Sequence, residues 1–182
     1  VLEGTKYDQH QQLANAVPPL LGFAIARHIK KHLAGYGKTA KKKKAVPADA
    51  LRFIDLFSGI GGFRVALEKA HCRCVFSSEN DPWASETYAK NFHEVPAGDI
   101  TKIDEKNIPS HDILCAGFPC QPFSIGGHRK GFEDARGTLF FHVARILAAK
   151  KPSAFILENV PGIITHDGGN TIKTIRKVLD DV

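Results

Sequence analysis

The stretch LCAGFPCQPFS, residues 114–124, places one thiol, Cys120, where an apolar run ends. Pro119 and Pro122 restrict the backbone of the residues that precede them, so the thiol is held on a stiff segment. A thiolate fixed in a cleft acts as a nucleophile when its surroundings favour the anion. A buried, unreactive cysteine is the commoner alternative, and Cys115, inside the apolar run, fits that alternative.

A carboxyl and an amide, Glu158 and Asn159, end a second apolar run, SAFILENV. If the two runs are adjacent parallel strands, they finish at the same edge of the sheet, and Glu158 then lies near Cys120. A carboxyl beside a thiol in a concave site would assist a covalent step as an acid. The alternative is a capping pair at a strand end. The basic, glycine-containing residues 124–137 between the runs predict either a solvated loop or closure over an anionic substrate.

The stretch DLFSGIGGF, residues 55–63, predicts a glycine turn between a strand and a helix. Glycines let the backbone approach a ligand, and the helix that follows offers free N–H groups to an anion. The dinucleotide fingerprint is not matched, because its last glycine, counted from Gly59, falls on Arg64. Glu79 ends the next predicted strand about twenty residues on, where a carboxylate can accept hydrogen bonds from ribose. Together these features predict a nucleoside site; the alternative is a structural turn beside a surface glutamate.

Asp99 and Ile100, in the stretch AGDIT, follow the next short apolar segment. A carboxylate there could accept a hydrogen bond from an adenine amine, and Ile100 could cover the ring. We favour the simpler alternative, in which Asp99 caps the next turn.

Alternating strands and helices must position these residues, and such alternation predicts a parallel sheet with helices on both faces. Ligands then collect at the carboxyl ends of the strands. The expected strands are 52–57, 73–79, a short stretch before Gly98, 111–117 and 153–159, and the expected helices are 63–70, 81–92, 138–150 and 170–182.

The first 34 residues predict a helix that Asn15 caps and that ends at Gly35. Four apolar residues recur at helical spacing and predict its buried face: Leu21, Ile25, Ile29 and Leu33. Residues 35–50 are rich in lysine and predict a linker, and residues 51–182 form the main domain. The net charge of +6 comes from the first fifty residues, because residues 51–182 hold sixteen basic and sixteen acidic residues.

The composition of the 182 residues, 43% hydrophobic and 24% charged, is ordinary for one globular α/β domain. Four cysteines at this spacing form neither a disulfide framework nor a zinc site, so we expect free thiols and no metal. No signal peptide or long apolar run is evident, and we expect a cytoplasmic protein without membrane contact.

These motifs in this order resemble the DNA cytosine-5 methyltransferase family over residues 51 to about 175. DLFSGIGGF resembles the family's first motif, SENDPWA the second, GDI the third, GFPCQPFS the nucleophile motif and FILENV the motif with the catalytic glutamate. The resemblance implies a Rossmann-like fold, S-adenosylmethionine as methyl donor and a cytosine flipped out of duplex DNA, in a restriction-modification or other DNA-modification system. It also implies that Cys120 adds to C6 of cytosine while Glu158 stabilises a proton at N3.

The resemblance carries further roles onto individual residues. The implied cofactor contacts are Phe57, Gly59, Gly61, Glu79, Asp99, Ile100, Leu139 and Asn15. The implied DNA contacts are Ser124, Arg129, Lys130 and Arg136.

Three departures from the family pattern qualify this expectation. Asn80 follows Glu79 where relatives often place a large apolar side chain. The stretch QQLANAV, residues 11–17, resembles a motif usually found at the carboxyl terminus, so a circular permutation through the linker is expected. The last two strands and the target-recognition region of the family do not follow residue 182. We therefore expect a second chain or further segment that completes the enzyme and reads the target.

Other functions remain open at this point. A tRNA cytosine-5 methyltransferase would use the same chemistry on another nucleic acid. A non-catalytic cofactor- or DNA-binding subunit would not need both Cys120 and Glu158. A nicotinamide oxidoreductase is disfavoured by the glycine spacing.

Overall fold

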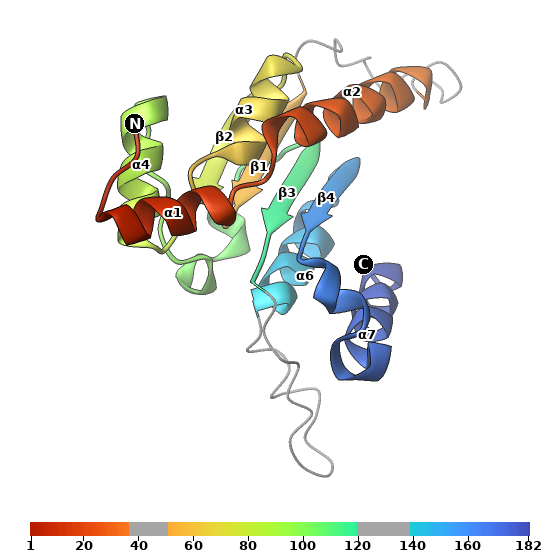
Figure 1. The fold of residues 1–182 in the computed structure, drawn as a ribbon. Helices are drawn as coiled ribbons and strands as arrows, with labels where there is room; N and C mark the ends of the chain where they lie inside the picture. Colours follow the sequence, from red (N-terminus) through yellow and green to blue (C-terminus); the bar gives the residue numbers. More distant parts are fainter. Residues whose placement is uncertain (37–50, 120–138) are drawn as a thin grey trace.

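The computed structural model describes residues 1–36, 51–119 and 139–182 (Figure 1). Its four strands are β1 (Arg52–Leu56), β2 (Arg73–Ser78), β3 (Ile113–Gly117) and β4 (Ala154–Glu158). They form one parallel sheet in the order β2-β1-β3-β4, so their carboxyl ends lie at one edge. The expected α/β, Rossmann-like class is confirmed. The predicted residues Cys120, Ser124, Arg129, Lys130 and Arg136 lie outside the described residues.

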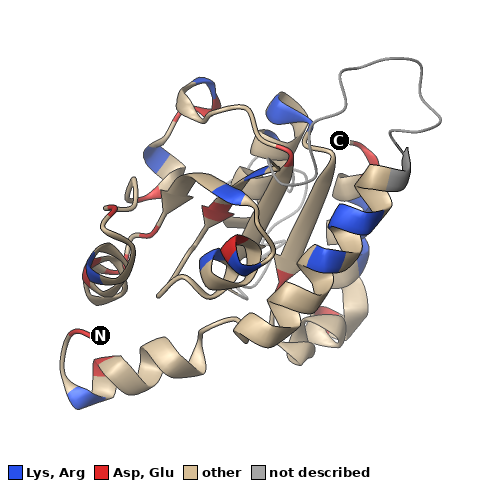
Figure 2. Ribbon diagram, turned by 90° about the horizontal axis from the view of Figure 1, so that it is seen from above, with Lys and Arg blue, Asp and Glu red and all other residues tan. Residues whose placement is uncertain are grey.

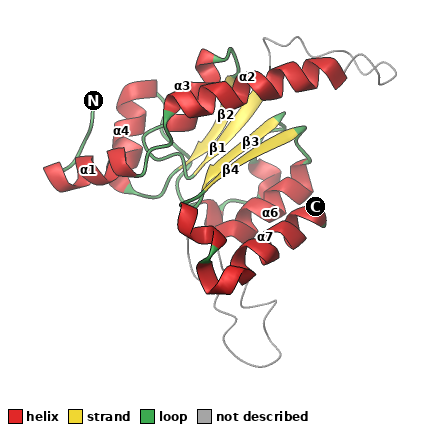
Figure 3. Ribbon diagram, turned by 45° about the vertical axis from the view of Figure 1, so that its right-hand side comes forward, coloured by secondary structure: helices red, strands yellow, loops and turns green. Residues whose placement is uncertain are grey.

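Helices cover both faces of the sheet (Figure 3). The helices α2 and α3 lie on one face, and α6 and α7 lie toward the other. The bounds are α1 (Lys6–Ala14), α2 (Pro19–Tyr36), α3 (Gly62–Lys69), α4 (Pro82–Phe92), α6 (Leu139–Lys150) and α7 (Asn170–Asp180). Short 3-10 turns are η2 (Ile100–Lys102), η3 (Glu105–Asn107), η4 (Pro161–Ile164) and η5 (His166–Gly169).

The sheet separates two apolar clusters because successive residues of a strand face opposite sides. In β1, Phe53 packs into the cluster under α2 and α3, whereas Ile54 and Leu56 pack into the cluster under α6. All three side chains are fully buried. Helix α6 contributes Val143 and Ile146 to the second cluster, which confirms that this nearly all-apolar helix is buried.

The prediction for the amino-terminal segment was partly wrong. Residues 6–14 form a separate helix, α1, and Asn15 is its C-cap and not the N-cap of the next helix. The missed signal is the capping box of Thr5 and Asp8, since a Thr-x-x-Asp pattern resembles the usual Thr-x-x-Glu box. The following helix begins at Pro19 and ends at Tyr36.

The predicted buried face of α2 also needs one correction. Ile25, Ile29 and Leu33 pack against the first cluster as expected, but Leu21 is 57% exposed. Gly22 takes the contact position instead, because a Cβ on Gly22 would lie 2.8 Å from Cβ of Ala66 in α3.

No strand forms in the stretch before Gly98, where a third strand was predicted. His93 ends α4 in the left-handed conformation, and Pro96 has no N–H to donate. Ala97 makes one backbone hydrogen bond, to the Ser77 carbonyl of β2, at 2.8 Å. This segment therefore runs beside β2 without joining the sheet as a strand.

A cycle of hydrogen bonds fastens the amino terminus to α4. The buried Thr87 hydroxyl accepts from the Glu3 amide at 2.9 Å and donates to Gln12 Oε1 at 2.8 Å. Gln12 Nε2 closes the cycle by donating to the Glu3 carbonyl at 2.9 Å. Lys90 adds an ion pair with Glu3 at 2.9 Å.

Charge is unevenly distributed over the helices (Figure 2). Helix α2 carries Arg27, Lys30 and Lys31 and no acidic residue. No helix in the described part of the chain combines the length and hydropathy of a membrane span.

The amino-terminal segment also packs directly onto the start of α3. A Cβ on Gly62 would lie 2.5 Å from the Val17 carbonyl oxygen and 3.2 Å from Val17 Cβ. The backbone of the segment between α1 and α2 thus comes close to α3 only because residue 62 is glycine.

Replacing Gly62 with alanine is expected to displace residues 15–18 from α3. We predict a loss of about 1–3 kcal/mol in the free energy of unfolding, as for overpacking elsewhere. Urea denaturation followed by circular dichroism measures it. Gly162→Ala is the matched control, because its added Cβ meets nothing within 4 Å. Equal stability of the two variants would contradict the close packing of Val17.

Candidate cofactor and catalytic site

The glycine turn begins where β1 ends. Phe57, with φ of 55°, and Gly59, with φ of 53°, both adopt the left-handed conformation. The Ser58 amide donates to the Ser78 carbonyl at 3.0 Å, which continues the pairing of β1 with β2 beyond Leu56. A Cβ on Gly59 would meet nothing within 4 Å, so the backbone there faces open space. The predicted glycine turn thus forms, and its backbone at Gly59 is open to an approaching ligand.

The carboxylate of Glu79 holds the turn against the end of β2. Its Oε2 accepts a hydrogen bond from the Gly59 amide at 2.7 Å. Its Oε1 accepts from the amides of Asn80 and Asp81, each at 2.9 Å. Glu79 is half-buried, and three backbone donors fix its orientation before any ligand binds. A carboxylate accepts about four hydrogen bonds, so capacity remains for a ribose hydroxyl.

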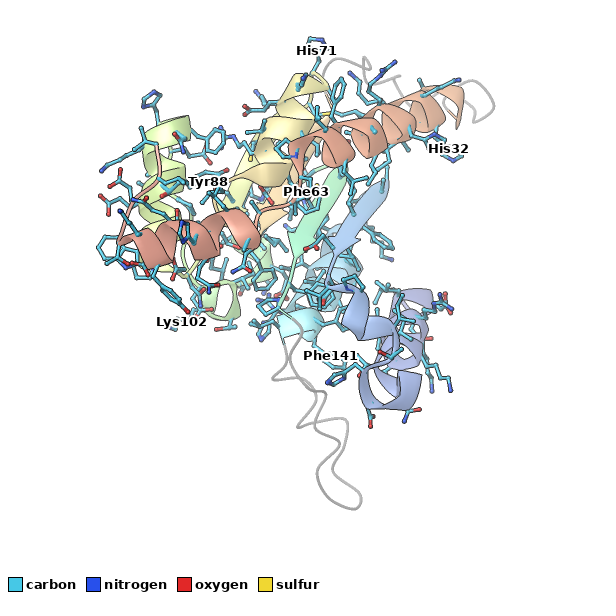
Figure 4. The ribbon with its side chains drawn as sticks, viewed as in Figure 1. His32, Phe63, His71, Tyr88, Lys102 and Phe141 are labelled. Atoms are coloured by element: carbon cyan, nitrogen blue, oxygen red, sulfur yellow. The ribbon has the colours of Figure 1, made fainter. Side chains whose placement is uncertain are left out.

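A buried arginine joins the turn to α4. Arg64, in the first turn of α3, donates to the Tyr88 hydroxyl at 2.9 Å and pairs with Glu94 at 2.8 Å. Its guanidinium lies 5.0 Å from the centre of the Phe92 ring. Figure 4 shows Tyr88 between α4 and α3. The Phe92 ring in turn covers Gly61, where φ is 90° and no Cβ could be accommodated.

Sequence analysis missed this arginine as part of the site. Arg64 occupied the position that excludes the dinucleotide fingerprint, and its partner Glu94 lies 30 residues away along the chain. One feature of the sequence could have revealed it: Arg64 is a charged residue at a position of the predicted helix that faces the protein interior.

Asp55 lies beneath the turn and is fully buried. Burial raises the pKa of its carboxyl well above the usual range, while the backbone N–H and positive charge of Arg64 act in the opposite direction. A carboxyl in such surroundings favours its neutral form. Both carboxyl oxygens of Asp55 are buried without a hydrogen-bond partner among the described residues.

Asp99 has the capping role that sequence analysis favoured. It is the N-cap of η2, and its Oδ1 accepts from the Thr101 amide at 3.0 Å and from the Thr101 hydroxyl at 2.8 Å. These hydrogen bonds lower the pKa of Asp99. Ile100 is 3% exposed and belongs to the cluster under α6. Leu139 is half-buried at the first position of α6.

The amino-terminal segment reaches the same edge of the sheet. Asn15 is exposed at the end of α1, two residues before Val17. A Cβ on Gly117 would lie 3.9 Å from Val17 Cγ2 and 3.3 Å from Glu158 Oε2. Val17 thus lies between the start of α3 and the carboxyl end of β3.

Glu158 is the last residue of β4 and pairs in register with Gly117 of β3. Because residue 117 has no side chain, the carboxyl of Glu158 lies over its backbone. Burial raises the pKa of Glu158, which favours the protonated form that a general acid requires. Cys115 is fully buried in β3, which confirms that part of the prediction, and burial raises the pKa of its thiol well above the usual range.

The arrangement suits a nucleoside-containing cofactor. The open backbone at Gly59, the fixed carboxylate of Glu79 and the cap at Asp99 follow β1, β2 and the segment beside β2. The sheet order changes direction between β1 and β3, which is where ligands bind in open α/β sheets. The described residues hold no cluster of three or more side chains that could bind a metal ion.

Replacing Glu79 with alanine is expected to leave three backbone N–H groups without their acceptor. We predict a loss of about 1–3 kcal/mol in the free energy of unfolding, measured by urea denaturation. Glu86→Ala is the control, because Glu86 is exposed and forms an ion pair with Lys90 one helical turn away. Identical stabilities of the two variants would argue that Glu79 does not hold the turn.

Comparisons with known proteins agree with this geometry. The family model for C-5 cytosine-specific DNA methylases matches residues 51–182. The type II methyltransferase M.HhaI of Haemophilus parahaemolyticus is 57% identical over 132 residues, which are 72% of this chain and 40% of that protein. The type II methyltransferase M.MspI of Moraxella sp. is 49% identical over 178 residues, 97% of this chain and 39% of that protein.

Among solved structures, S. pombe Dnmt2 methyltransferase superposes with a TM-score of 0.56 at 27% identity, covering 72% of this chain and 42% of its own. The chain thus spans about two fifths of the length of these relatives. From the glycine turn to the glutamate that ends β4, this chain belongs to the C-5 cytosine-specific DNA methylase family.

Proposed function

We propose that this chain is the cofactor-binding and catalytic part of an enzyme that methylates C5 of cytosine in duplex DNA, in a restriction-modification system. The observation that carries the proposal is the meeting of two features at one edge of the sheet. The glycine turn held by Glu79 follows β1, and Glu158, with its raised pKa, ends β4. Family membership supports the reaction.

S-adenosylmethionine is the cofactor that family membership implies, and the described residues fit it. Glu79 and the backbone at Gly59 would hold the ribose and the methionine part of the cofactor, and Asp99 would accept a hydrogen bond from the adenine amine. Phe57, in its left-handed conformation at the turn, would pack on the adenine ring. When bound, this cofactor supplies an electrophilic methyl group.

The protein's own task is to make C5 of cytosine nucleophilic. The thiolate of Cys120 adds to C6, and Glu158 donates its proton to N3, so that electron density from the C5–C6 bond collects at C5. Once C5 carried a methyl group, loss of the C5 proton to a base would re-form the C5–C6 double bond and expel the Cys120 thiolate, and the N3 proton would return to the Glu158 carboxylate. Glu158 suits the role of proton donor to N3, because its raised pKa keeps its carboxyl protonated at a higher pH than usual.

The edge of the sheet at β4 bears on how the target is read. Within the described part of the chain, β4 pairs on one side only, with β3. Phe155 of this strand is 44% exposed. An unpaired strand with an exposed aromatic is a place where further chain adds to a sheet. We propose that another segment or a second chain completes the sheet and carries the region that reads the target.

The position of QQLANAV before the first motif supports a circular permutation. In the structure this segment packs on α3 through Val17 and on α4 through Gln12.

Covalent trapping tests the reaction. We predict that the enzyme, completed by its recognition region, forms an adduct with duplex DNA containing 5-fluorocytosine and that Cys120→Ser abolishes the adduct. Cys72→Ser is the control, because Cys72 precedes β2 and is buried in the cluster under α2 and α3. The adduct is measured by denaturing gel electrophoresis.

Two outcomes would contradict the proposal. Adducts with RNA alone would assign the chain to RNA methylation. An unchanged activity of Cys120→Ser would make the chain a binding subunit. The isolated 182-residue chain should bind S-adenosylmethionine weakly and show no sequence-specific methylation, and specific activity of this chain alone would contradict the need for a further segment.

A further inference from the structure

Asn159, the residue after Glu158, ties the ends of two strands together through its side chain. Its Nδ2 donates to the carbonyl of Phe118 at 2.6 Å. Its Oδ1 accepts from the amide of Val160 at 2.9 Å. One amide side chain therefore satisfies one backbone acceptor after β3 and one backbone donor after β4.

This tie lies where the sheet stops supplying backbone pairing. The register of β3 with β4 ends at the pair of Gly117 and Glu158. Phe118 and Asn159 are the next residues on each strand, and they are 41 positions apart along the chain. The hydrogen bond from the Asn159 side chain to Phe118 thus joins β3 and β4 one residue beyond their last backbone pair, at the edge of the sheet that carries the site.

Glu158 needs this support because its own side chain has no partner. No hydrogen bond or ion pair joins the Glu158 carboxyl to any residue in the ranges 1–36, 51–119 and 139–182. Burial is the cause of its raised pKa, and no charged group in the described part of the chain contributes to the shift. The position of the carboxyl over Gly117 therefore depends on where the backbone of β4 ends relative to β3.

We propose that Asn159 is a positioning residue that holds the carboxyl of Glu158 over the end of β3. The catalytic importance of this positioning rests on the proposed function. The positioning itself concerns only Asn159, Glu158 and the end of β3, all of which the structure describes. Through Phe118 the same hydrogen bond also fixes the point from which the chain continues to Pro119. A plain strand-end cap would contact only its own neighbour, whereas Asn159 bonds across to the adjacent strand.

The first measurement is the pKa of Glu158, followed in the 182-residue chain by NMR titration of its side-chain carboxyl carbon. Glu158→Gln assigns the signal. We expect a pKa above the usual value in the wild type, because burial penalises the charged form. In Asn159→Ala and Asn159→Leu the carboxyl gains water as the strand ends separate, and its pKa falls back toward the usual value.

The variants separate hydrogen bonding from packing. Asn159→Leu keeps the side-chain volume but removes both hydrogen bonds, so it should behave like Asn159→Ala. The matched control is Asn91→Ala, because Asn91 also bridges two backbone groups, the amine and the carbonyl of Val1, at 2.9 and 3.0 Å. That variant should leave the pKa of Glu158 unchanged.

The second measurement is the rate of covalent trapping on 5-fluorocytosine DNA by the completed enzyme. Loss of positioning should lower this rate about 10- to 100-fold without changing the affinity for S-adenosylmethionine. A Glu158 pKa that is unchanged in both Asn159 variants, or restored in Asn159→Leu, overturns the inference. If the wild type forms no adduct, the proposed function fails, and the pKa comparison still decides the role of Asn159.

Discussion

Two consecutive glycines after β1 set how closely the parts of this fold approach one another. Gly61 lies under the ring of Phe92, and Gly62 lies against the backbone of Val17. A side chain at either position would separate α3 from α4 or from the amino-terminal segment. Three pieces that are distant in sequence therefore converge on one helix start, and the cofactor turn lies directly before it.

The parallel sheet adds the second constraint, because it sends every strand end to one edge. The strand registers end at the pairs Leu56–Ser78 and Gly117–Glu158, and one further backbone hydrogen bond joins Ser58 to Ser78. Polar side chains continue the connection beyond these points. The carboxylate of Glu79 joins the end of β2 to the turn after β1, and the amide of Asn159 joins the end of β4 to the end of β3. The site is thus positioned by side chains that act as extensions of the sheet.

Local patterns in the sequence were enough to predict the four strands that form, the glycine turn and the place of Glu79. These features depend on apolar runs, glycine and chain order. The contacts of Arg64 and Asn159 could not be predicted in this way, because their partners Glu94 and Phe118 lie 30 and 41 positions away. Such partners become visible only when the register between strands and the packing of α3 on α4 are known.

The amino-terminal error has a different physical cause. The prediction placed one helix after Asn15 and none before it, whereas residues 6–14 form α1 and Asn15 is its C-cap. Apolar periodicity revealed α2 but not α1, because α1 consists mostly of polar residues. The third predicted strand failed because one backbone hydrogen bond, from Ala97, is too little pairing to form a strand.

NMR titration of the nitrogen-15-labelled chain with S-adenosylmethionine tests most directly whether this edge of the sheet is the cofactor site. The structure predicts that the amide signals of Gly59 and Asn80, together with that of Val17, shift as cofactor is added, while those of α7 stay in place. Shifts confined to α7, with the glycine turn unaffected at saturation, would contradict the assignment of the site.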